Sequence, residues 1–405
     1  MYTVFTMLTD DRSVRATFGE TAIRIFISLA FVSSLSCVST RNGVSVGDAS
    51  KPEPAPLVLT FTGDIMAHSV NFNMTDYDLI YRDIRDRLHS DDITFGNLET
   101  PVYDSRPLST WPRFNVHRTY LEAAIRGGFD SFSLANNHSN DQGVKGIAAT
   151  LSAFGHVSKN AAFANRVSHS GLKLSRDEAI KPVLIERRGR RVLFLAVTEI
   201  LNSFDGSKDF VYYVAPTESS RAAFLAEIAR MRAEYPCDVF VLSIHCDEPE
   251  YVREPTADKR RWFRSLAEAG ADVVWGNHPH VMQPWEVVRV SGRDRDALLM
   301  YSMGNFVSGQ RFELNTGNPA SAREYTGDSV LMRVTFGGES GALDVEVVPV
   351  TNYTDPGVGV VVREFTGAFV DSLSPALRRY YEKRYALMAS YLPLLPLRPD
   401  TAILE

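Results

Sequence analysis

The sequence contains little cysteine, and its cysteines do not form a disulfide framework. Only three occur among 405 residues, at positions 37, 237 and 246. Cys237 and Cys246 bracket the apolar run at 239–244, which is typical of a strand. A strand rises about 3.3 Å per residue, so these two would lie roughly 30 Å apart, whereas a disulfide needs Cα atoms within about 7 Å. We therefore predict that Cys237 and Cys246 are unpaired.

The chain also lacks clustered basic charge. Lys and Arg total 43 against 49 Asp and Glu, a net charge of -6, and no basic run would follow a phosphate backbone. Nucleic acid is therefore not an expected partner. With 44% hydrophobic residues, a chain of 405 residues can bury a large core.

No apolar stretch reaches the ~20 residues that a membrane-spanning helix needs. The apolar stretch at 25–35 follows Arg24 and ends in small residues before Cys37, a pattern typical of a secretory signal. We predict a lipoprotein signal over 1–37, with Cys37 as the lipidated residue. An ordinary cleaved signal or an uncleaved anchor are the alternatives. In each case the protein is expected to be exported to the cell envelope. It is expected to contact the membrane through a lipid group or through the signal segment.

Proline and polar residues then mark a linker. Pro52, Pro54 and Pro56 alternate in a polar stretch, so residues 38–56 are predicted to be an extended linker. The main domain is predicted over 57–350, followed by a helical C-terminal extension over 351–405. Its basic and aromatic helix at 374–392 is expected to dock on the body; contact with a membrane surface is the alternative.

Within 57–350, short apolar runs alternate with segments of helical period. The runs lie at 56–62, 92–95, 129–135, 191–197, 238–244, 271–275, 297–303, 329–336 and 343–350. Helical spacing appears at 77–88 and again at 224–231 behind a predicted N-cap at Thr217, while Gly127 and Gly270 are predicted helix stops. Continuously apolar strands alternating with helices favour an α/β fold with a covered sheet.

Polar clusters follow these runs directly. They lie at 62–68, 96–101, 135–143, 245–251, 276–286 and 301–306. Ligands in open α/β sheets bind beyond the carboxyl ends of strands, so the clusters are expected to meet. Their carboxylates, amides and imidazoles, without a thiolate, suit Mn, Fe, Zn or Mg. His278 and His280 would present two imidazoles to one metal if their backbone were extended.

The ordered motifs resemble one known family. GD at 63–64, NLE at 97–99, ANNH at 135–138, EY at 250–251, HPHV at 278–281 and GNF at 304–306 occur in the order found in the CapA-like, poly-γ-glutamate capsule-synthesis family. This family is a branch of the calcineurin-like metallophosphoesterases. The resemblance covers 57 to about 310. It implies central β-sheets sandwiched by helices, with a metal site at the carboxyl ends of the strands.

The resemblance also assigns roles to residues. It implies two divalent metal ions and a general-acid histidine, His138. The implied metal ligands are Asp64, Glu99, Asn137, His245, His278 and His280. Residues expected to support the site or contact substrate are His68, Asn97, Arg113, Asp141, Tyr301 and Asn305.

Each role has an alternative. Asp64 could cap a helix, Glu99 could be an exposed turn carboxylate, and Asn137 and Asp141 could form Asx-turns. His68 could reach the metal or face solvent.

The other supporting residues also have simpler explanations. Arg113 could bind an anionic substrate or form an ordinary salt bridge. Tyr301 and Asn305 could order the site or only end a strand.

Two departures from the family pattern concern the substrate side. The HCDEPEY stretch at 245–251 is one residue longer than the family's usual H-W-G-x-E-Y, and Asn277 replaces a histidine. Asp247 or Glu248 would disfavour a phosphate if either faced it.

The predicted function is a two-metal hydrolase at the envelope, acting on a phosphoester or a polymer-linked bond in capsule or poly-γ-glutamate-type polymer production. The rival is a non-catalytic metal-binding component that assists assembly or export of an anionic polymer. Capsule-synthesis proteins are the expected protein partners.

Overall fold

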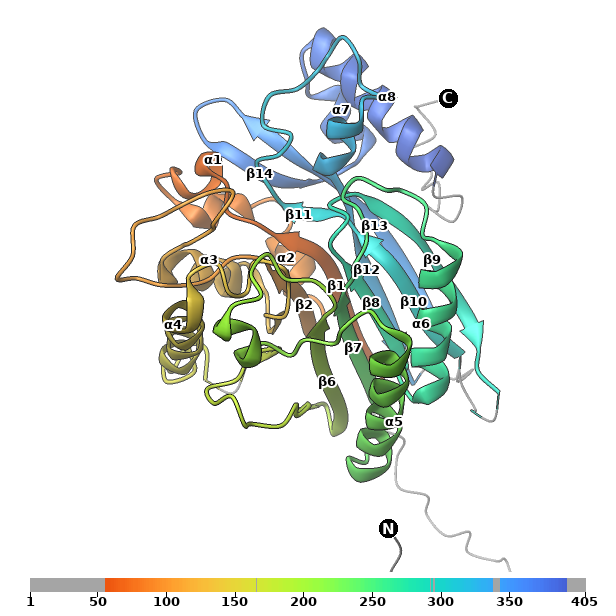
Figure 1. Cartoon of the computed structure of the whole chain (residues 1–405). Coiled ribbons are helices and arrows are strands. Elements are labelled where there is room, and N and C mark those ends of the chain that lie inside the picture. Colours follow the sequence, from red (N-terminus) through yellow and green to blue (C-terminus); the bar gives the residue numbers. More distant parts are fainter. Residues whose placement is uncertain (1–54, 165, 292, 294–295, 338–342, 392–405) are drawn as a thin grey trace, which may run out of the picture. The chain divides into compact units, whose positions relative to one another are not determined.

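The computed structural model describes residues 55–391, apart from 165, 292, 294–295 and 338–342 (Figure 1). Contacts divide the chain into Met1–Pro52 and Glu53–Glu405, and the described residues belong to the second unit. The predicted signal segment, Cys37 and most of the linker lie outside the described residues.

One sheet has eight strands in the order β14-β13-β12-β1-β2-β3-β4, with β11 paired to β1. β1 to β4 run parallel, while β12, β13 and β14 are antiparallel to their neighbours. The strands are β1 (Leu57–Ile65), β2 (Ile93–Leu98), β3 (Ser131–Ser133), β4 (Ser168–Ser170), β11 (Asn305–Val307), β12 (Asp328–Phe336), β13 (Asp344–Asp355) and β14 (Gly359–Glu364).

A second sheet has six strands in the order β5-β6-β7-β8-β10-β9. Its inner strands β6, β7, β8 and β10 are parallel, and both edge strands are antiparallel. The strands are β5 (Val183–Arg187), β6 (Arg190–Thr198), β7 (Val239–His245), β8 (Val273–Asn277), β9 (Met282–Arg289) and β10 (Asp296–Met303).

The main core lies between the two sheets. Phe61 of β1 stacks on Phe95 of β2 with ring centroids 5.0 Å apart, and Phe95 meets Phe194 of β6 at 5.2 Å. The next residues along β6, Leu193 and Leu195, belong to a second cluster with α5 (Glu218–Glu234) and α6 (Ala257–Ala269). Successive strand residues face opposite sides, so covering both faces explains why β6 is apolar throughout.

Helices cover the sheets on two sides. α3 (Arg118–Gly127) and α4 (Gly143–Val157) lie on the side opposite α5 and α6 (Figure 1). The Thr217 cap is confirmed, because its side chain accepts a hydrogen bond from the Ser220 amide. Both glycine stops are also confirmed: α3 ends at Gly127, and Gly270 caps α6 with φ 141°. The mixed α/β fold predicted from the sequence is therefore present.

The single helix suggested by the spacing over 77–88 is wrong. A 3₁₀ turn, η1 (Tyr77–Ile80), and a short helix, α2 (Arg85–Leu88), occupy this segment. Tyr81 lies between them and is fully buried against Gly127, where a Cβ would approach the Tyr81 ring to 2.7 Å. Burying Tyr81 together with Ile80 and Ile84 demands a wider apolar face than one helical stripe gives.

The remaining helical elements are short, except near the C-terminus. They are α1 (Ser69–Phe72), η2 (Gly206–Phe210), η3 (Ala322–Gly327), α7 (Gly367–Asp371) and α8 (Pro375–Tyr391). β13 runs through residue 351 and β14 extends the same sheet, so the segment after 350 begins as sheet and becomes helical only from α7. The helix expected at 374–392 is present as α8.

A buried ionic cluster attaches α8 to the eight-stranded sheet. Asp328, at the start of β12, accepts hydrogen bonds from Arg311 and, at 3.0 Å, from Nε of Arg384 on α8. Both arginines are fully buried. Tyr380, one turn earlier on α8, donates to Glu324. The expected docking of the C-terminal helix on the body is therefore confirmed.

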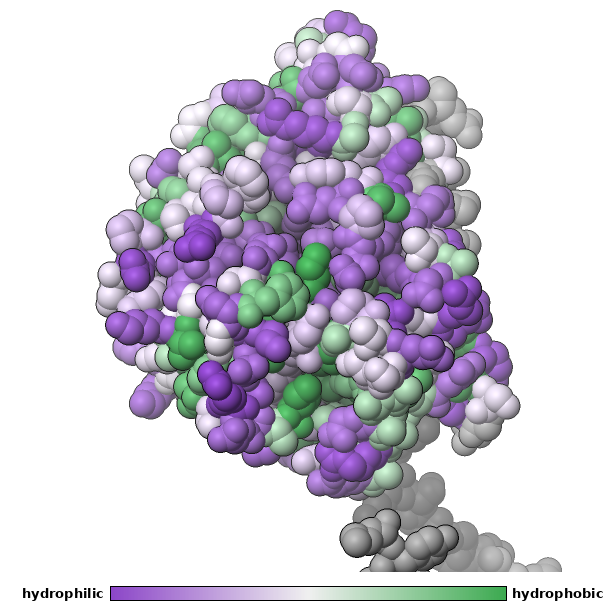
Figure 2. Space-filling view, in the orientation of Figure 1, coloured by the Kyte–Doolittle hydropathy of each residue, from purple (hydrophilic) through white to green (hydrophobic). Residues whose placement is uncertain are grey.

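Hydrophobic side chains are scattered on the face of the molecule that Figure 2 shows. This face is mostly hydrophilic, with hydrophobic side chains in small separate patches. Among the described residues, no helix is both long and apolar enough to cross a membrane. Both described cysteines, Cys237 and Cys246, are free, as predicted.

Candidate metal centre

Three polar side chains stand side by side where the parallel strands of the first sheet end. Asp64 near the end of β1 pairs in register with Asn97 of β2 and Asn305 of β11. The approach of β11 depends on Gly63, because a Cβ there would lie 1.8 Å from the Gly304 carbonyl oxygen. The Asp64 amide donates to the same carbonyl at 2.9 Å. A glycine before the aspartate thus lets a third strand reach the site.

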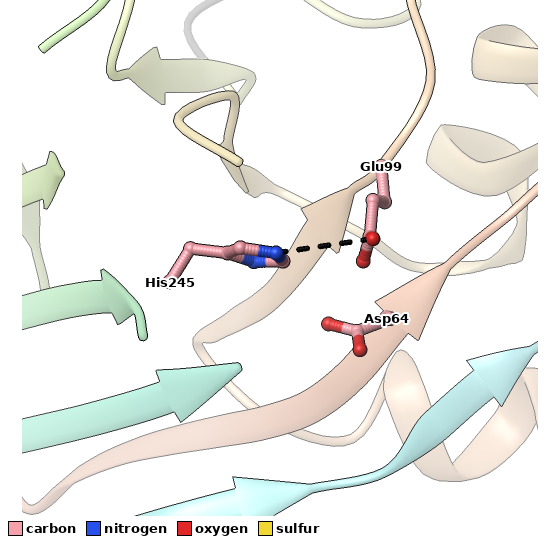
Figure 3. Close-up of side chains that lie close together, drawn as sticks. All are labelled: Asp64, Glu99 and His245. Atoms are coloured by element: carbon pink, nitrogen blue, oxygen red, sulfur yellow. Dashed lines mark ion pairs between the residues drawn. The ribbon is translucent and has the colours of Figure 1, made fainter. Parts of the chain in front are cut away.

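A cluster of metal-ligating atoms lies at this edge. Asp64, Glu99 and His245 each offer an atom within 4.8 Å of the others, and all three are buried (Figure 3). Asp64 and Glu99 come from the first sheet, and His245 ends β7 of the second. Two simpler explanations are thereby excluded. Glu99 is buried, so it is not an exposed turn carboxylate, and the N-cap of α1 is His68, so Asp64 does not cap that helix.

The carboxylates leave unsatisfied oxygen atoms. Among the described residues, Oδ2 of Asp64 and Oε1 of Glu99 are buried without a hydrogen-bond donor. Their other oxygens are held by Asn97, whose amide donates to Asp64 at 2.8 Å and to Glu99 at 3.3 Å. A buried carboxylate oxygen without a partner is costly, and a cation satisfies it. The residues therefore fit a divalent metal.

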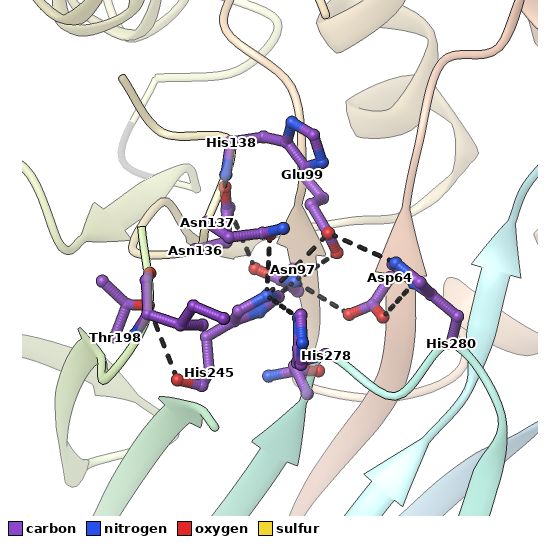
Figure 4. Close-up of polar contacts among 12 residues, drawn as sticks. Asp64, Asn97, Glu99, Asn136, Asn137, His138, Thr198, His245, His278 and His280 are labelled. Atoms are coloured by element: carbon purple, nitrogen blue, oxygen red, sulfur yellow. Dashed lines mark hydrogen bonds and ion pairs between the residues drawn. The ribbon is translucent and has the colours of Figure 1, made fainter. Parts of the chain in front are cut away.

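One group of potential ligands surrounds His245. Its Nε2 lies 3.0 Å from Oδ1 of Asn137, 3.1 Å from Nδ1 of His278 and 3.8 Å from Oε1 of Glu99 (Figure 4). These are a carboxylate, an amide oxygen and two imidazoles, a donor set that suits Zn, Mn or Fe.

A second group surrounds His280. Its Nδ1 lies 3.3 Å from Oδ2 of Asp64 and 3.0 Å from Oδ1 of Asn305, and its Nε2 lies 3.8 Å from Oε1 of Glu99. The same Glu99 oxygen is thus 3.8 Å from an imidazole nitrogen in each group. This central position is suited to a carboxylate shared by two cations.

The two histidines reach the site differently from the expectation. Extended backbone was predicted for His278 and His280, but they follow the end of β8 with φ of 110° and 58°. Their rings diverge, with centroids 6.0 Å apart, so each serves a different group. Positive φ is unfavourable for a residue with a Cβ and is found mainly where function constrains the backbone.

Burial favours the uncharged form of most of these groups in the absence of a metal. It raises the pKa of Glu99 well above its usual value, helped by the charges of Asp64 and Glu250. Burial lowers the pKa of His278 to about 3 and that of His245 well below its usual value. Burial also opposes charge on His280, but the nearby carboxylates of Asp64 and Glu250 together outweigh this effect and raise its pKa. Neutral imidazole is the form that binds metals.

His138 lies beside the cluster in a different environment. Its Nδ1 is 2.7 Å from Oδ2 of Asp141, which also accepts a hydrogen bond from the Phe114 amide. Phe114 packs against the imidazole ring edge-on at 4.6 Å. A carboxylate at Nδ1 orients the ring and leaves Nε2 for proton transfer.

The remaining predicted residues differ in how close they come to the cluster. His68 is partly buried: its Nδ1 accepts from the Gly309 amide at 3.1 Å, and burial lowers its pKa to about 4, so it does not simply face solvent. Tyr301 packs on Phe263 on the outer face of the second sheet, away from the ligands. Arg113 is exposed and forms no ion pair with any described residue.

Two functional candidates were not singled out from the sequence. Glu250 faces the cluster with Oε1 4.0 Å from Nε2 of His280, and Nδ2 of Asn202 lies 3.2 Å from Nδ1 of His138. Glu250 stood within the EY motif. Asn202 follows β6 and could have been found by the rule that located the other clusters, a polar loop after an apolar run.

The longer loop after β7 does not turn Glu248 toward the site. Its side chain is 6% exposed and pairs with the buried Lys259, while Gln283 donates to it at 3.1 Å. Asp247 is exposed, and it is not among the residues that line the polar pocket next to His138. The loop instead presents Glu250.

Comparison with known proteins agrees with this geometry. Residues 58–310 match the model of the bacterial capsule synthesis protein PGA_cap family. The chain belongs to this family. The family is part of the metallophosphoesterase-like superfamily, so the predicted resemblance is confirmed.

Individual members of the capsule synthesis family are distant from this chain. It is 26% identical over 299 residues to capsule biosynthesis protein CapA of Bacillus anthracis, covering 71% of this chain and 68% of that protein. It is also 26% identical over 262 residues to PGA biosynthesis protein CapA of Bacillus subtilis strain 168, covering 63% and 64%. The chain therefore spans about two thirds of these relatives. A hypothetical protein from Thermus thermophilus, solved as a crystal structure, aligns over 72% of this chain and 99% of its own with 18% identity and a TM-score of 0.40.

Proposed function

We propose that this protein is a metal-dependent hydrolase of the metallophosphoesterase type, acting on a phosphoester or another polymer-linked bond during capsule synthesis. The observation that carries the proposal is the buried cluster of Asp64, Glu99 and His245, with a free oxygen on each carboxylate. Family membership and the capsule-related names of the Bacillus relatives support the setting.

The proposed metal ligands fall into two groups that share Glu99. Asn137, His245 and His278 would hold one cation, and Asp64 and His280 the other. When bound, two divalent cations supply positive charge that stabilises phosphoryl oxygens and makes a water nucleophilic. Asn97 keeps the two carboxylates in place by donating to both.

His138 is the proposed general acid. The Asp141 carboxylate holds the proton at Nδ1 and fixes the ring, so Nε2 can deliver a proton to the departing oxygen. Asn202, which approaches the same ring at 3.2 Å, limits its rotation.

The cellular setting is part of the proposal. An exported protein held at the envelope by lipid on Cys37 would work where a surface polymer is made, with capsule-synthesis proteins as partners. Its metals would come from Mn, Fe, Zn or Mg, which the oxygen and imidazole ligands accept.

Metal content and hydrolysis test this proposal together. Purified protein should carry close to two divalent ions by mass spectrometry and should hydrolyse bis-p-nitrophenyl phosphate. Asp64→Asn should lose metal and lower turnover by roughly 100-fold or more. Loss of a residue that only supports a metal ligand costs up to about 100-fold, and Asp64 is itself a proposed ligand. His169→Gln is the matched control, since this histidine packs on Phe154 outside the cluster.

The rival function predicts that the protein has no hydrolytic activity. A non-catalytic polymer-assembly component would hold its metals and yet hydrolyse no phosphodiester or polymer. Wild-type protein that is fully loaded with metal but inactive on all such substrates contradicts the hydrolase.

A further inference from the structure

A polar pocket opens directly beside the proposed general acid. It has a volume of about 580 Å³, within the usual range for ligand sites of roughly 300 to 1,000 Å³. His138 and Asn137 form part of its lining, and Glu250 contributes from the loop after β7. The rest of the wall comes from residues 140–143 and from two further loops, at 106–113 and 202–205. A molecule bound here would contact His138.

Two arginines on the first of these loops are available for an anion. Arg106 and Arg113 both line the pocket, and both are exposed. Neither side chain forms an ion pair with any residue in the described part of the chain. Arg113 is near enough to Asp205 to influence its carboxyl group, but the two are not in contact. Arginine is well suited to carboxylates and phosphates, because its planar fork donates two parallel hydrogen bonds.

One exposed aromatic side chain lines the same pocket. Trp111 is 71% exposed and stands on the loop at 106–113, next to Arg113 in the lining. The other exposed large aromatics among the described residues, Phe204 and Tyr251, are not part of the lining, and Phe204 packs edge-on against Tyr213. Trp111 therefore offers an apolar ring face that a ligand in the pocket can cover.

The carboxylates at the pocket do not cancel this pattern. Asp141 is engaged by His138, and Asp205 accepts a hydrogen bond from the Ser207 amide at 2.8 Å. Glu250 lies on the side of the metal cluster, 4.0 Å from His280. The two arginines thus remain the groups that can receive a negative charge from a ligand.

We infer that this pocket binds a segment of an acidic polysaccharide, with a sugar ring on Trp111 and carboxylate or phosphate groups on Arg106 and Arg113. The apolar C–H face of a sugar ring packs on an aromatic face, which carries partial negative charge. A poly-γ-glutamate chain offers the carboxylates but has no ring for Trp111. That the bound segment is also cleaved rests on the proposed function; the binding itself does not.

Tryptophan fluorescence provides a direct measurement. Of the four tryptophans, Trp262, Trp275 and Trp285 are buried, so acrylamide quenching of the full chain reports mainly on Trp111. A hyaluronan oligosaccharide supplies carboxylates and a phosphomannan oligosaccharide supplies phosphates. At least one of the two should protect Trp111 from acrylamide, while neutral dextran and poly-γ-glutamate of similar length should not. Which acidic glycan protects better identifies the preferred anion.

Variants separate the two halves of the proposal. Trp111→Ala and Arg113→Gln should each weaken glycan binding by roughly tenfold, as loss of a main contact does, when measured by calorimetry. Trp111→Phe should restore most of the affinity. Leu174→Ala and Arg289→Gln, exposed residues outside the pocket, should bind like wild type. Thermal midpoints equal to wild type show that the variants are folded.

Three results would overturn the inference. They are protection by neither acidic glycan, equal protection by poly-γ-glutamate with no effect of Trp111→Ala, and equal binding of neutral dextran. Hydrolysis of bis-p-nitrophenyl phosphate is measured alongside. Glycan binding without hydrolysis leaves this inference standing and removes the hydrolase, whereas hydrolysis without glycan binding does the reverse.

Discussion

Among single residues, His138 and its neighbour Asn137 show most clearly how adjacent side chains take different roles. Asn137 directs its amide oxygen to His245 at 3.0 Å, whereas His138 turns to Asp141 at 2.7 Å. The first contact belongs to the ligand cluster and the second to the pocket beside it. Loss of one should therefore affect metal binding, and loss of the other proton transfer.

We expect His138→Ala to retain both metals and to lose roughly 10²- to 10⁴-fold in turnover on substrates with poor leaving groups, the usual contribution of a general acid. Activated aryl phosphates need less help and should suffer less. Asp141→Asn should show the same dependence on the leaving group with a smaller loss, because His138 remains but is less well oriented. Steady-state kinetics over a series of leaving groups measures both.

Asn137→Ala serves as the contrast in that series. Loss of the Asn137 amide should lower metal content and reduce turnover of all substrates equally. Equal slowing of good and poor leaving groups by His138→Ala would show that this histidine holds the site together and does not deliver a proton.

At this scale the sequence was most informative where a side chain follows a strand. Asp64 and Asn97 lie at the ends of neighbouring parallel strands, so their meeting followed from the rule that such strands end at one edge. His245 ends a strand of the other sheet, so its approach depends on how the two sheets pack. His278 and His280 meet the cluster through left-handed backbone, which no spacing reveals. The position of Glu250 depends on the loop after β7, which Lys259 holds by pairing with Glu248. The sequence does not reveal this contact, because only folding brings the two residues together.

Among the elements, α8 is attached to the sheet through buried charge. Arg384 reaches from α8 to Asp328 of β12, where Arg311 also binds. Removing one partner from a buried ion pair leaves a charge uncompensated and usually costs about 3 to 5 kcal/mol. Asp328 retains Arg311, so the lower end of this range applies.

Arg384→Met should accordingly lower the free energy of unfolding by about 3 kcal/mol, measured by urea denaturation monitored by circular dichroism. Arg379→Met, an exposed arginine on the same helix, should change it by less than about 0.5 kcal/mol. If both variants unfold at the same urea concentration, the buried pair does not hold α8 in place.

Strands were predicted better than helices because most are buried on both faces. All nine apolar runs recognised in the sequence coincide with strands of the two sheets. β4 and β11 contain three residues each, too few to show a period. The segment at 77–88 carried a helical pattern, yet burial of Tyr81 outside that stripe divided it.

For the whole molecule, the position of the ligands between two sheets links metal binding to stability. Asp64 lies in β1 and Glu99 directly follows β2 of the first sheet, whereas His245 ends β7 and the two other histidines follow β8 of the second sheet. A ligand that binds only the folded protein stabilises it according to its concentration, by roughly 3 kcal/mol at about 100 times its Kd. Removal of the metal should therefore loosen the contact between the sheets.

We expect chelation with EDTA to lower the thermal midpoint in differential scanning calorimetry and added Mn²⁺ or Zn²⁺ to restore it. The His278→Ala, His280→Ala double variant should respond less, since it lacks a ligand from each group. A midpoint that is the same with and without chelator would mean that the cluster binds no metal in the folded protein.

The layered α/β architecture was within reach of the sequence, because alternating strands and helices favour covered sheets. Strand order was not. Nothing local in the sequence indicates that β12, from near the end of the chain, lies beside β1, or that β11 joins β1 at Gly63. Such pairings depend on contacts between distant segments.

The place of β1 in its sheet bears on the time at which the protein can fold during synthesis. β1 is the first strand made among the described residues and lies in the middle of the sheet, with one edge reserved for β12, which begins at Asp328. A ribosome adds about 5 to 20 residues per second, so this edge stays open for tens of seconds while the chain grows. An open strand edge invites pairing with other chains. The nascent polypeptide therefore has to be kept from such partners until nearly all of it has emerged.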